Sequence, residues 1–324
     1  MKNPVNSKAI PNKATPAQKA PSKGAAIQEK HTTSEAFGLI LRYNLDFLLE
    51  WAPIAYKGED IEGVHQARVG LRRLRSALGL FRKALPREYT DSWGTEMQWV
   101  ATAMGEARDL DVFISEGLKA MAGKIPLASG EQKLTVLATQ RRNEAYSNVR
   151  IMLESDRYKT FVTDFASWVD NRGWNHVDVP NEVRHELDKS IRLYASKLLN
   201  KRMRSTLAFG AKMGTMSTEE LHELRIECKK LRYAVEFFQP IFVEKGIQVF
   251  TLHLKGLQDL LGIMNDVTVM HGLLDKMLQN ETDLETMQYA GALIGWRARQ
   301  YEEVRGQLDA RWSEFSSAAL PWMK

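Results

Sequence analysis

The stretch "VHQARVGLRRLRSALGLF", residues 64–81, decides how this chain can fold. At about 100° per residue, its apolar residues fall on one helical stripe, which predicts burial against a core. That stripe consists of Val64, Ala67, Leu71, Leu74, Leu78 and Phe81. A second stripe directly beside it carries only basic side chains, namely His65, Arg68, Arg72 and Arg75. The remaining arginine of the stretch, Arg73, lies outside this cationic stripe.

The same pattern returns 157 residues later in "LHELRIECKKLRYAVEFF", residues 221–238. The second cationic stripe consists of His222, Arg225, Lys229 and Arg232, and Lys230 falls off it as Arg73 does. Ser217 and Glu220 have the spacing of a capping box at the start of this helix. The same offset carries "MGEARDLDV" at residue 104 onto "LGIMNDVTV" at residue 261 without a gap. This internal repeat predicts two related helical halves, residues 33–180 and 181–324, about a pseudo-twofold axis.

The remaining sequence from residue 33 onward is also typical of helices. Segments such as "FGLILRYNLDFLLEWA", residues 37–52, place apolar residues three and four apart, and strand-like alternation is scarce. We therefore predict an all-α fold of two pseudo-symmetric antiparallel helical bundles with a basic groove or channel between them. No run of 18 apolar residues occurs, so we expect no membrane-spanning helix. The single cysteine, Cys228, cannot form an intramolecular disulfide, which fits a reducing cytoplasm.

Residues 1–32 have a different composition. Residues 1–30 contain six lysines against Glu29 alone, which equals the whole formal net charge of +5. Four prolines and very few large apolar residues accompany them, so this stretch cannot bury enough surface to offset the entropy of ordering. We predict a disordered basic tail, which serves as a solubilising spacer or as an auxiliary contact to a polyanion.

The cationic stripes suit an extended ligand with many negative charges. Each stripe is ten residues long, about 15 Å along the helix axis. Arginine binds phosphate oxygens bidentately, lysine adds a point charge, and histidine donates a hydrogen bond when neutral. The alternative interpretation is a solvated face or a partner of acidic helices. Asp109, Asp111 and Asp266 are the candidate internal counter-charges, and the sequence leaves open whether Asp109 and Asp266 are structural or linked to a metal.

The repeated pattern His-x-x-Arg-[Val/Ile]-x-x-[Arg/Lys]-[Arg/Lys]-Leu-Arg, with an [Arg/Asn]-Asp element downstream, resembles the CHAD family (conserved histidine α-helical domain) over residues 33–324. The resemblance implies a basic surface or channel between two helical bundles and binding of inorganic polyphosphate. It carries over to His65, Arg68, Arg72, Arg73, Arg75, Arg108, His222, Arg225, Lys229, Lys230 and Arg232. Asn265 stands where the second half would repeat Arg108, so that half offers one cation fewer there.

The same stripes leave room for further residues and other functions. Basic residues on neighbouring helices could extend the site, namely Arg42, Arg82, Lys197, Arg202, Arg204 and Lys255. The favoured function is non-catalytic binding of inorganic polyphosphate, without cofactor or metal, in the cytoplasm or at polyphosphate granules. The alternatives are a metal-dependent phosphate or polyphosphate hydrolase and a binder of the nucleic-acid backbone. The sequence contains neither a Gly-rich phosphate loop nor a His-Glu-x-x-His zinc motif. It does not determine the oligomeric state or the preferred polyphosphate length.

Overall fold

The computed structural model describes residues 24–85, 87–176 and 180–323, and in this part of the chain the fold is all-α. The α-helices are α1 (Thr33–Lys57), α2 (Ile61–Phe81), α3 (Arg87–Ala103), α4 (Gly105–Val112), α5 (Lys119–Met121), α6 (Ala128–Glu154), α7 (Asp156–Asp170), α8 (Asn181–Asp188), α9 (Ile191–Leu207), α10 (Thr218–Phe238), α11 (Glu244–Met277), α12 (Leu284–Arg305) and α13 (Leu308–Ser316). A π-helical segment, Phe113–Leu118, continues α4. The described residues contain no strand, only an isolated bridge between Thr32 and Ser190.

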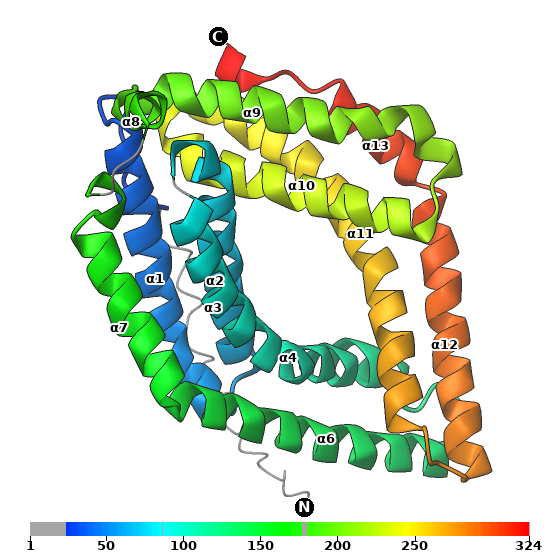
Figure 1. Cartoon of the computed structure of the whole chain (residues 1–324). Coiled ribbons are helices and arrows are strands. Elements are labelled where there is room, and N and C mark those ends of the chain that lie inside the picture. Colours follow the sequence, from blue (N-terminus) through cyan, green and yellow to red (C-terminus); the bar gives the residue numbers. More distant parts are fainter. Residues whose placement is uncertain (1–23, 86, 177–179, 324) are drawn as a thin grey trace, which may run out of the picture.

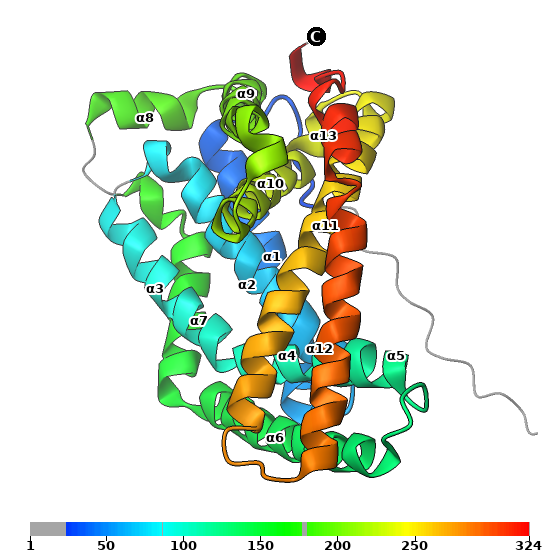
Figure 2. The ribbon, with the colours of Figure 1, turned by 90° about the vertical axis from the view of Figure 1, so that its right-hand side faces the viewer.

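The helices are arranged as a frame around the middle of the molecule (Figure 1). α1 and α7 form one side, α9, α10 and α13 the next, α11 and α12 the third, and α4 and α6 the fourth. α2 packs along α1 and also contacts α10, while α4 contacts α11. Figure 2 shows α11 and α12 running side by side along the third side of the frame. The two basic helices, α2 and α10, therefore approach each other from different sides of the frame.

The apolar stripes of α2 and α10 are buried as predicted. All six residues of the α2 stripe are at most 3% exposed, and the six equivalent residues of α10, which include Cys228, are at most 4% exposed. Ser217 and Glu220 form the predicted capping box at the start of α10. α10 begins and ends 157 residues after α2. Burial of one face fixes the rotation of each helix, and this rotation in turn fixes where the adjacent cationic stripe points.

Two glycines allow close approaches that the frame requires. A Cβ atom at Gly63 would lie 2.5 Å from the backbone nitrogen of Ala55, where the start of α2 crosses α1. A Cβ atom at Gly130 would lie 2.3 Å from the carbonyl oxygen of Glu285, where α6 meets α12. Any larger residue would push these helix pairs apart.

The predicted tail falls into two parts. Residues 1–23 lie outside the described residues, whereas residues 24–32 are described and pack on the domain. Ala25 and Ile27 are 8% and 3% exposed and belong to the core, and Glu29 pairs with Arg192 at 2.5 Å. The packed domain therefore begins before Thr33. Ala25 and Ile27 are buried in its core, which the composition of residues 1–32 does not predict.

Asp111 secures α4 against α6. Its carboxylate is fully buried, accepts a hydrogen bond from Arg142 Nε at 2.6 Å and accepts another from the Tyr146 hydroxyl at 2.7 Å. Arg142 also donates to the carbonyl of Gly58 at 3.2 Å and lies over the Tyr146 ring. Asp111 is thus an internal counter-charge, as the sequence suggested, but its partner lies on α6 and not on a basic stripe.

We expect Asp111→Ala to lower the free energy of unfolding by about 3 kcal/mol, because it leaves the partly buried Arg142 guanidinium without its carboxylate. Denaturant unfolding followed by circular dichroism measures this change. The exposed Asp164 on α7 forms no ion pair with any residue that the structure describes, and Asp164→Ala should stay within about 0.5 kcal/mol of wild type as the control. Equal stability of the two variants would contradict a structural role for Asp111.

Candidate polyanion-binding site

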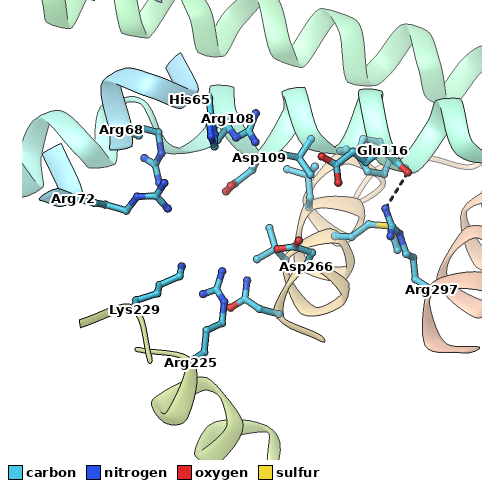
Figure 3. A pocket seen from close by; sticks show the side chains of 17 residues that line it. His65, Arg68, Arg72, Arg108, Asp109, Glu116, Arg225, Lys229, Asp266 and Arg297 are labelled. Atoms are coloured by element: carbon cyan, nitrogen blue, oxygen red, sulfur yellow. Dashed lines mark hydrogen bonds between the residues drawn. The ribbon is translucent and has the colours of Figure 1, made fainter. Parts of the chain in front are cut away.

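A cavity of about 420 Å³ lies where α2, α4 and the π-helical segment face α10, α11 and α12. We call it the central cavity. Its lining residues are His65, Arg68, Arg72, Arg108, Asp109, Val112, Phe113, Glu116, Gly117, Arg225, Lys229, Asn265, Asp266, Val269, Met270, Leu273 and Arg297. Figure 3 shows the cations of α2 and α10 pointing into it from opposite walls. The structure thus brings basic side chains more than 150 residues apart in sequence into one site.

Six of the basic residues predicted from the sequence line the central cavity: His65, Arg68, Arg72, Arg108, Arg225 and Lys229. Arg68 donates to the carbonyl of Ala101, which ties α2 to α3. The Nε atoms of Arg72 and Arg225 are buried and have no hydrogen-bond partner in the structure. Among the described residues, Arg72, Arg108, Arg225 and Lys229 form no ion pair. The cavity therefore holds positive charge that the protein itself leaves uncompensated.

Two predicted residues lie next to the central cavity. Arg75, one turn beyond Arg72, lines a second hollow that adjoins the cavity. His222 lines a largely apolar pocket between α10, α11 and α12, and its Nδ1 lies 3.2 Å from Oδ1 of Asn265. Asn265 and Arg225 line both that pocket and the central cavity. The two histidines of the repeat thus have different surroundings.

Three predicted residues point elsewhere and pair with carboxylates. Arg73 bonds to Glu236 at 3.2 Å and lies over the Phe47 ring. Arg232 pairs with the same Glu236 at 3.3 Å. Lys230 pairs with Glu227 at 2.6 Å. Helical periodicity places Arg73 and Lys230 off the cationic stripes and Arg232 on one. In the structure, Arg232 pairs with Glu236, which follows it by one helical turn.

None of the six suggested extension residues lines the central cavity. Four pair with carboxylates: Arg42 with Asp46 and Asp170, Arg82 with Asp91, Arg202 with Glu227, and Lys255 with Asp259. Arg82 borders a shallow hollow with Arg75, and Lys197 and Arg204 lie on α9, away from the cavity lining. Position on a neighbouring helix was therefore a poor guide to membership of the site.

The cavity also contains carboxylates. Asp109 and Asp266 face each other across it, and Glu116 lies beside them (Figure 3). Burial raises the pKa of Asp109, and the nearby Asp266 raises it further, while Arg68 and Arg108 oppose the shift. Among the described residues, no group of three or more His, Cys, Asp and Glu side chains is placed to hold a metal ion. Asp111, two residues after Asp109, points away toward α6.

Burial, assisted by neighbouring positive charge, lowers the pKa of two cavity residues. Burial lowers the pKa of His65 to about 4, assisted by Arg108, Arg72 and Arg68, so the imidazole is neutral near pH 7. Burial lowers the pKa of Lys229 to about 7, assisted by Arg225, Arg72 and Arg232. A lysine that is half charged at neutral pH indicates a site where one more cation is hard to accommodate without a counter-ion.

Sequence reasoning missed Arg297 on α12. Its guanidinium lines the cavity, donates to the Glu116 carbonyl at 3.0 Å and donates to Gln300 at 2.7 Å. Arg297 lies outside the repeated motif, in the mixed-charge segment "WRARQYEEVR", residues 296–305. No pattern distinguishes it from its neighbours, because only packing of α12 against α11 directs it inward.

The helices and the cavity define an all-α protein in which two basic helices share one cationic site. The CHAD domain family model matches residues 39–275, and the chain belongs to this family. The CHAD domain of the plant Ricinus communis has a similar solved structure, with a TM-score of 0.78 and 26% sequence identity over 92% of this chain and 97% of that chain. PptA from Streptomyces chartreusis shares the fold, with a TM-score of 0.65 and 16% identity over 87% of this chain and all of that chain. No curated protein matches the sequence.

The part of the chain that the structure describes has no helix both long and apolar enough to cross a membrane.

Because the pKa of Lys229 is about 7, we expect anion affinity to fall as the pH rises from 7 to 9. Above pH 7 the free protein must take up a proton to present the ammonium group, which weakens binding by up to about tenfold per pH unit. Titration of polyphosphate binding by calorimetry in buffers of different ionisation enthalpy measures both effects.

Lys229→Arg is the matched control, since the guanidinium stays charged throughout this range. Its affinity should be nearly independent of pH, and the ligand's own titration is common to both proteins. Parallel pH profiles for wild type and variant would show that Lys229 is not the titrating group.

Proposed function

We propose that this protein binds inorganic polyphosphate in the central cavity without cleaving it. The observation that carries the proposal is a set of four cations that line one cavity and form no ion pair within the described part of the chain: Arg72 from α2, Arg108 from α4, and Arg225 and Lys229 from α10. The resemblance of the repeated motif to the CHAD family, and membership of that family, support the same ligand.

Electrostatics favours a polyanion over a single phosphate. Like charges in a partly buried site repel one another, and a ligand with several linked negative charges relieves that repulsion at every position. Arg68, Arg72 and Arg225 offer planar donors that suit phosphate oxygens, and His65 offers a neutral hydrogen-bond donor. A linear chain of phosphates offers charged oxygens to both walls at once.

We also propose that α2 and α10 are equivalent elements of an internal repeat and that the central cavity is the basic groove between the two halves. The common offset of 157 residues at both ends of these helices supports the repeat. The presence of Arg68 and Arg72 from one half and Arg225 and Lys229 from the other supports the shared groove. A binding protein of this kind suits the cytoplasm and polyphosphate granules, which we propose as its location.

We expect tight binding of long-chain polyphosphate and weaker binding of ATP and duplex DNA at matched phosphate concentration, since the cavity suits a slender single chain. Affinity should fall steeply with salt, because each neutralised phosphate releases counter-ions. Arg72→Ala and Lys229→Ala should each weaken polyphosphate binding about tenfold, the value of one charge-assisted hydrogen bond. Fluorescence competition or calorimetry measures these affinities.

Arg299→Ala is the control, because Arg299 is 81% exposed on α12 and Glu303 is its only ion-pair partner among the described residues. It should leave affinity unchanged. The change in binding free energy of the double variant Arg72→Ala/Lys229→Ala should differ from the sum of the two single changes, because residues that contact the same ligand are energetically coupled. Equal affinity for polyphosphate and duplex DNA would favour a nucleic-acid binder instead.

We expect no shortening of polyphosphate and no phosphate release from tripolyphosphate in the presence of Mg²⁺ or Mn²⁺. The catalytic alternative would need the facing carboxylates Asp109 and Asp266 to hold the metal ion. Gel electrophoresis of the chains and a phosphate assay measure the reaction. Steady phosphate release that Asp109→Asn or Asp266→Asn abolishes would establish the hydrolase alternative.

A further inference from the structure

A second hollow of about 620 Å³ adjoins the central cavity on the α2 side. We call it the α2 hollow. Arg68, Arg72, Asp109 and Leu273 line both spaces, so the two are continuous along one face of α2. The α2 hollow adds the charged residues Arg75, Glu106, Arg141 and Lys276 from four different helices. Five cations and two carboxylates therefore border it.

Two of these cations have no carboxylate partner. Arg75, on α2, and Lys276, in the last turn of α11, form no ion pair among the described residues, and both are exposed. Arg141 pairs with Glu106 at 3.2 Å and with Glu144 at 3.8 Å, while 47% of its side chain stays exposed. The α2 hollow thus presents free positive charge where it adjoins the central cavity.

The equivalent face of α10 differs. Arg232, which follows Arg75 by 157 residues, pairs with Glu236 at 3.3 Å. Lys230 pairs with Glu227, which also lies 3.8 Å from Arg202. Glu227 is shared by Lys230 and Arg202, and Glu236 is shared by Arg232 and Arg73, so each of these cations has a carboxylate partner.

Two glycines account for the difference. The α2 positions that precede Glu227 and Glu236 by 157 residues are Gly70 and Gly79. Gly70 packs against Leu48 of α1, where a carboxylate would be buried. Gly79 is exposed, with no atom within 4 Å of an added Cβ. Arg75 is free because its neighbour one turn later lacks the carboxylate that captures Arg232.

We propose that a long polyphosphate leaves the central cavity on one side only and continues through the α2 hollow, held there by Arg75 and Lys276. The inference rests on the proposed function and adds a direction and a length dependence to it. A short chain occupies the central cavity alone, whereas a long chain gains the contacts of the α2 hollow. On the α10 side, the pocket that shares Arg225 and Asn265 with the central cavity is largely apolar and is also lined by Glu219 and Glu223, which makes that exit unfavourable for a polyanion.

The test compares long-chain polyphosphate with tripolyphosphate as probes by calorimetry or competition. Lys276→Gln removes one cation of the α2 hollow. Gly79→Glu places a carboxylate four residues after Arg75, which recreates the Arg232–Glu236 pair of α10. This substitution replaces an exposed helical glycine with a better helix former, so the fold is retained. We expect each variant to bind the long chain about tenfold more weakly, the value of one charge-assisted contact, and tripolyphosphate within about twofold of wild type.

Two matched controls carry the same charge changes elsewhere. Lys119→Gln removes the lysine that precedes Lys276 by 157 residues, on α5 and outside both spaces. Gly291→Glu adds a carboxylate at an exposed position of α12 with the same free space. Both should bind the two probes as wild type does, which separates local contacts from net charge.

The outcomes distinguish the two proposals. Both proposals are supported if Lys229→Ala weakens binding of both probes and if Lys276→Gln and Gly79→Glu weaken binding of the long chain alone. If Lys229→Ala acts but the α2 variants change neither probe, or change both equally, the one-sided path is wrong and the central site stands. If wild type binds neither probe, or Lys229→Ala changes neither, the proposed function fails and the path fails with it.

Discussion

Burial of the apolar stripes of α2 and α10 is the constraint on which the rest of the structure depends. Each stripe is almost fully removed from water, so neither helix can rotate without exposing large apolar side chains. The cationic stripe is covalently fixed beside the apolar one, and the rotation that buries Leu71 and Leu74 also directs Arg68 and Arg72 toward the central cavity. The hydrophobic core thus positions the charges.

The central cavity shows the electrostatic consequence of that arrangement. Burial lowers the proton affinity of basic groups in the cavity, and neighbouring positive charge adds to the effect, as the pKa values of His65 and Lys229 show. Asp109 and Asp266 offset part of the charge, since Asp109 interacts with Arg68 and Arg108, and Asp266 interacts with Arg225. By contrast, Asp111 forms a satisfied pair with Arg142 away from the cavity and serves the packing of α4 on α6. The same short segment, residues 105–112, therefore supplies one carboxylate to the site and one to the fold.

The two basic helices are similar in pattern and different in charge balance. On α10, Glu227 and Glu236 pair with the cations that flank the cavity. On α2, glycines occupy the matching positions. Gly70 packs closely against α1, whereas an added Cβ atom at Gly79 would meet open space. Two basic helices with matching sequence patterns can therefore differ in charge balance, since a side-chain change at one exposed position alters which arginines are left unpaired.

The sequence by itself determined the all-α class, the apolar stripes of both basic helices, the capping box at Ser217 and the resemblance to the family. These follow from local periodicity and short-range hydrogen bonding, and they need no knowledge of distant neighbours. Only the tertiary structure decided which basic residues share the cavity. It brought Arg297 in from α12, paired Asp111 with Arg142 and buried Ile27 on the domain. Each of these contacts depends on the packing of helices far apart in sequence, and a helical wheel records the direction of a side chain but not what lies opposite it.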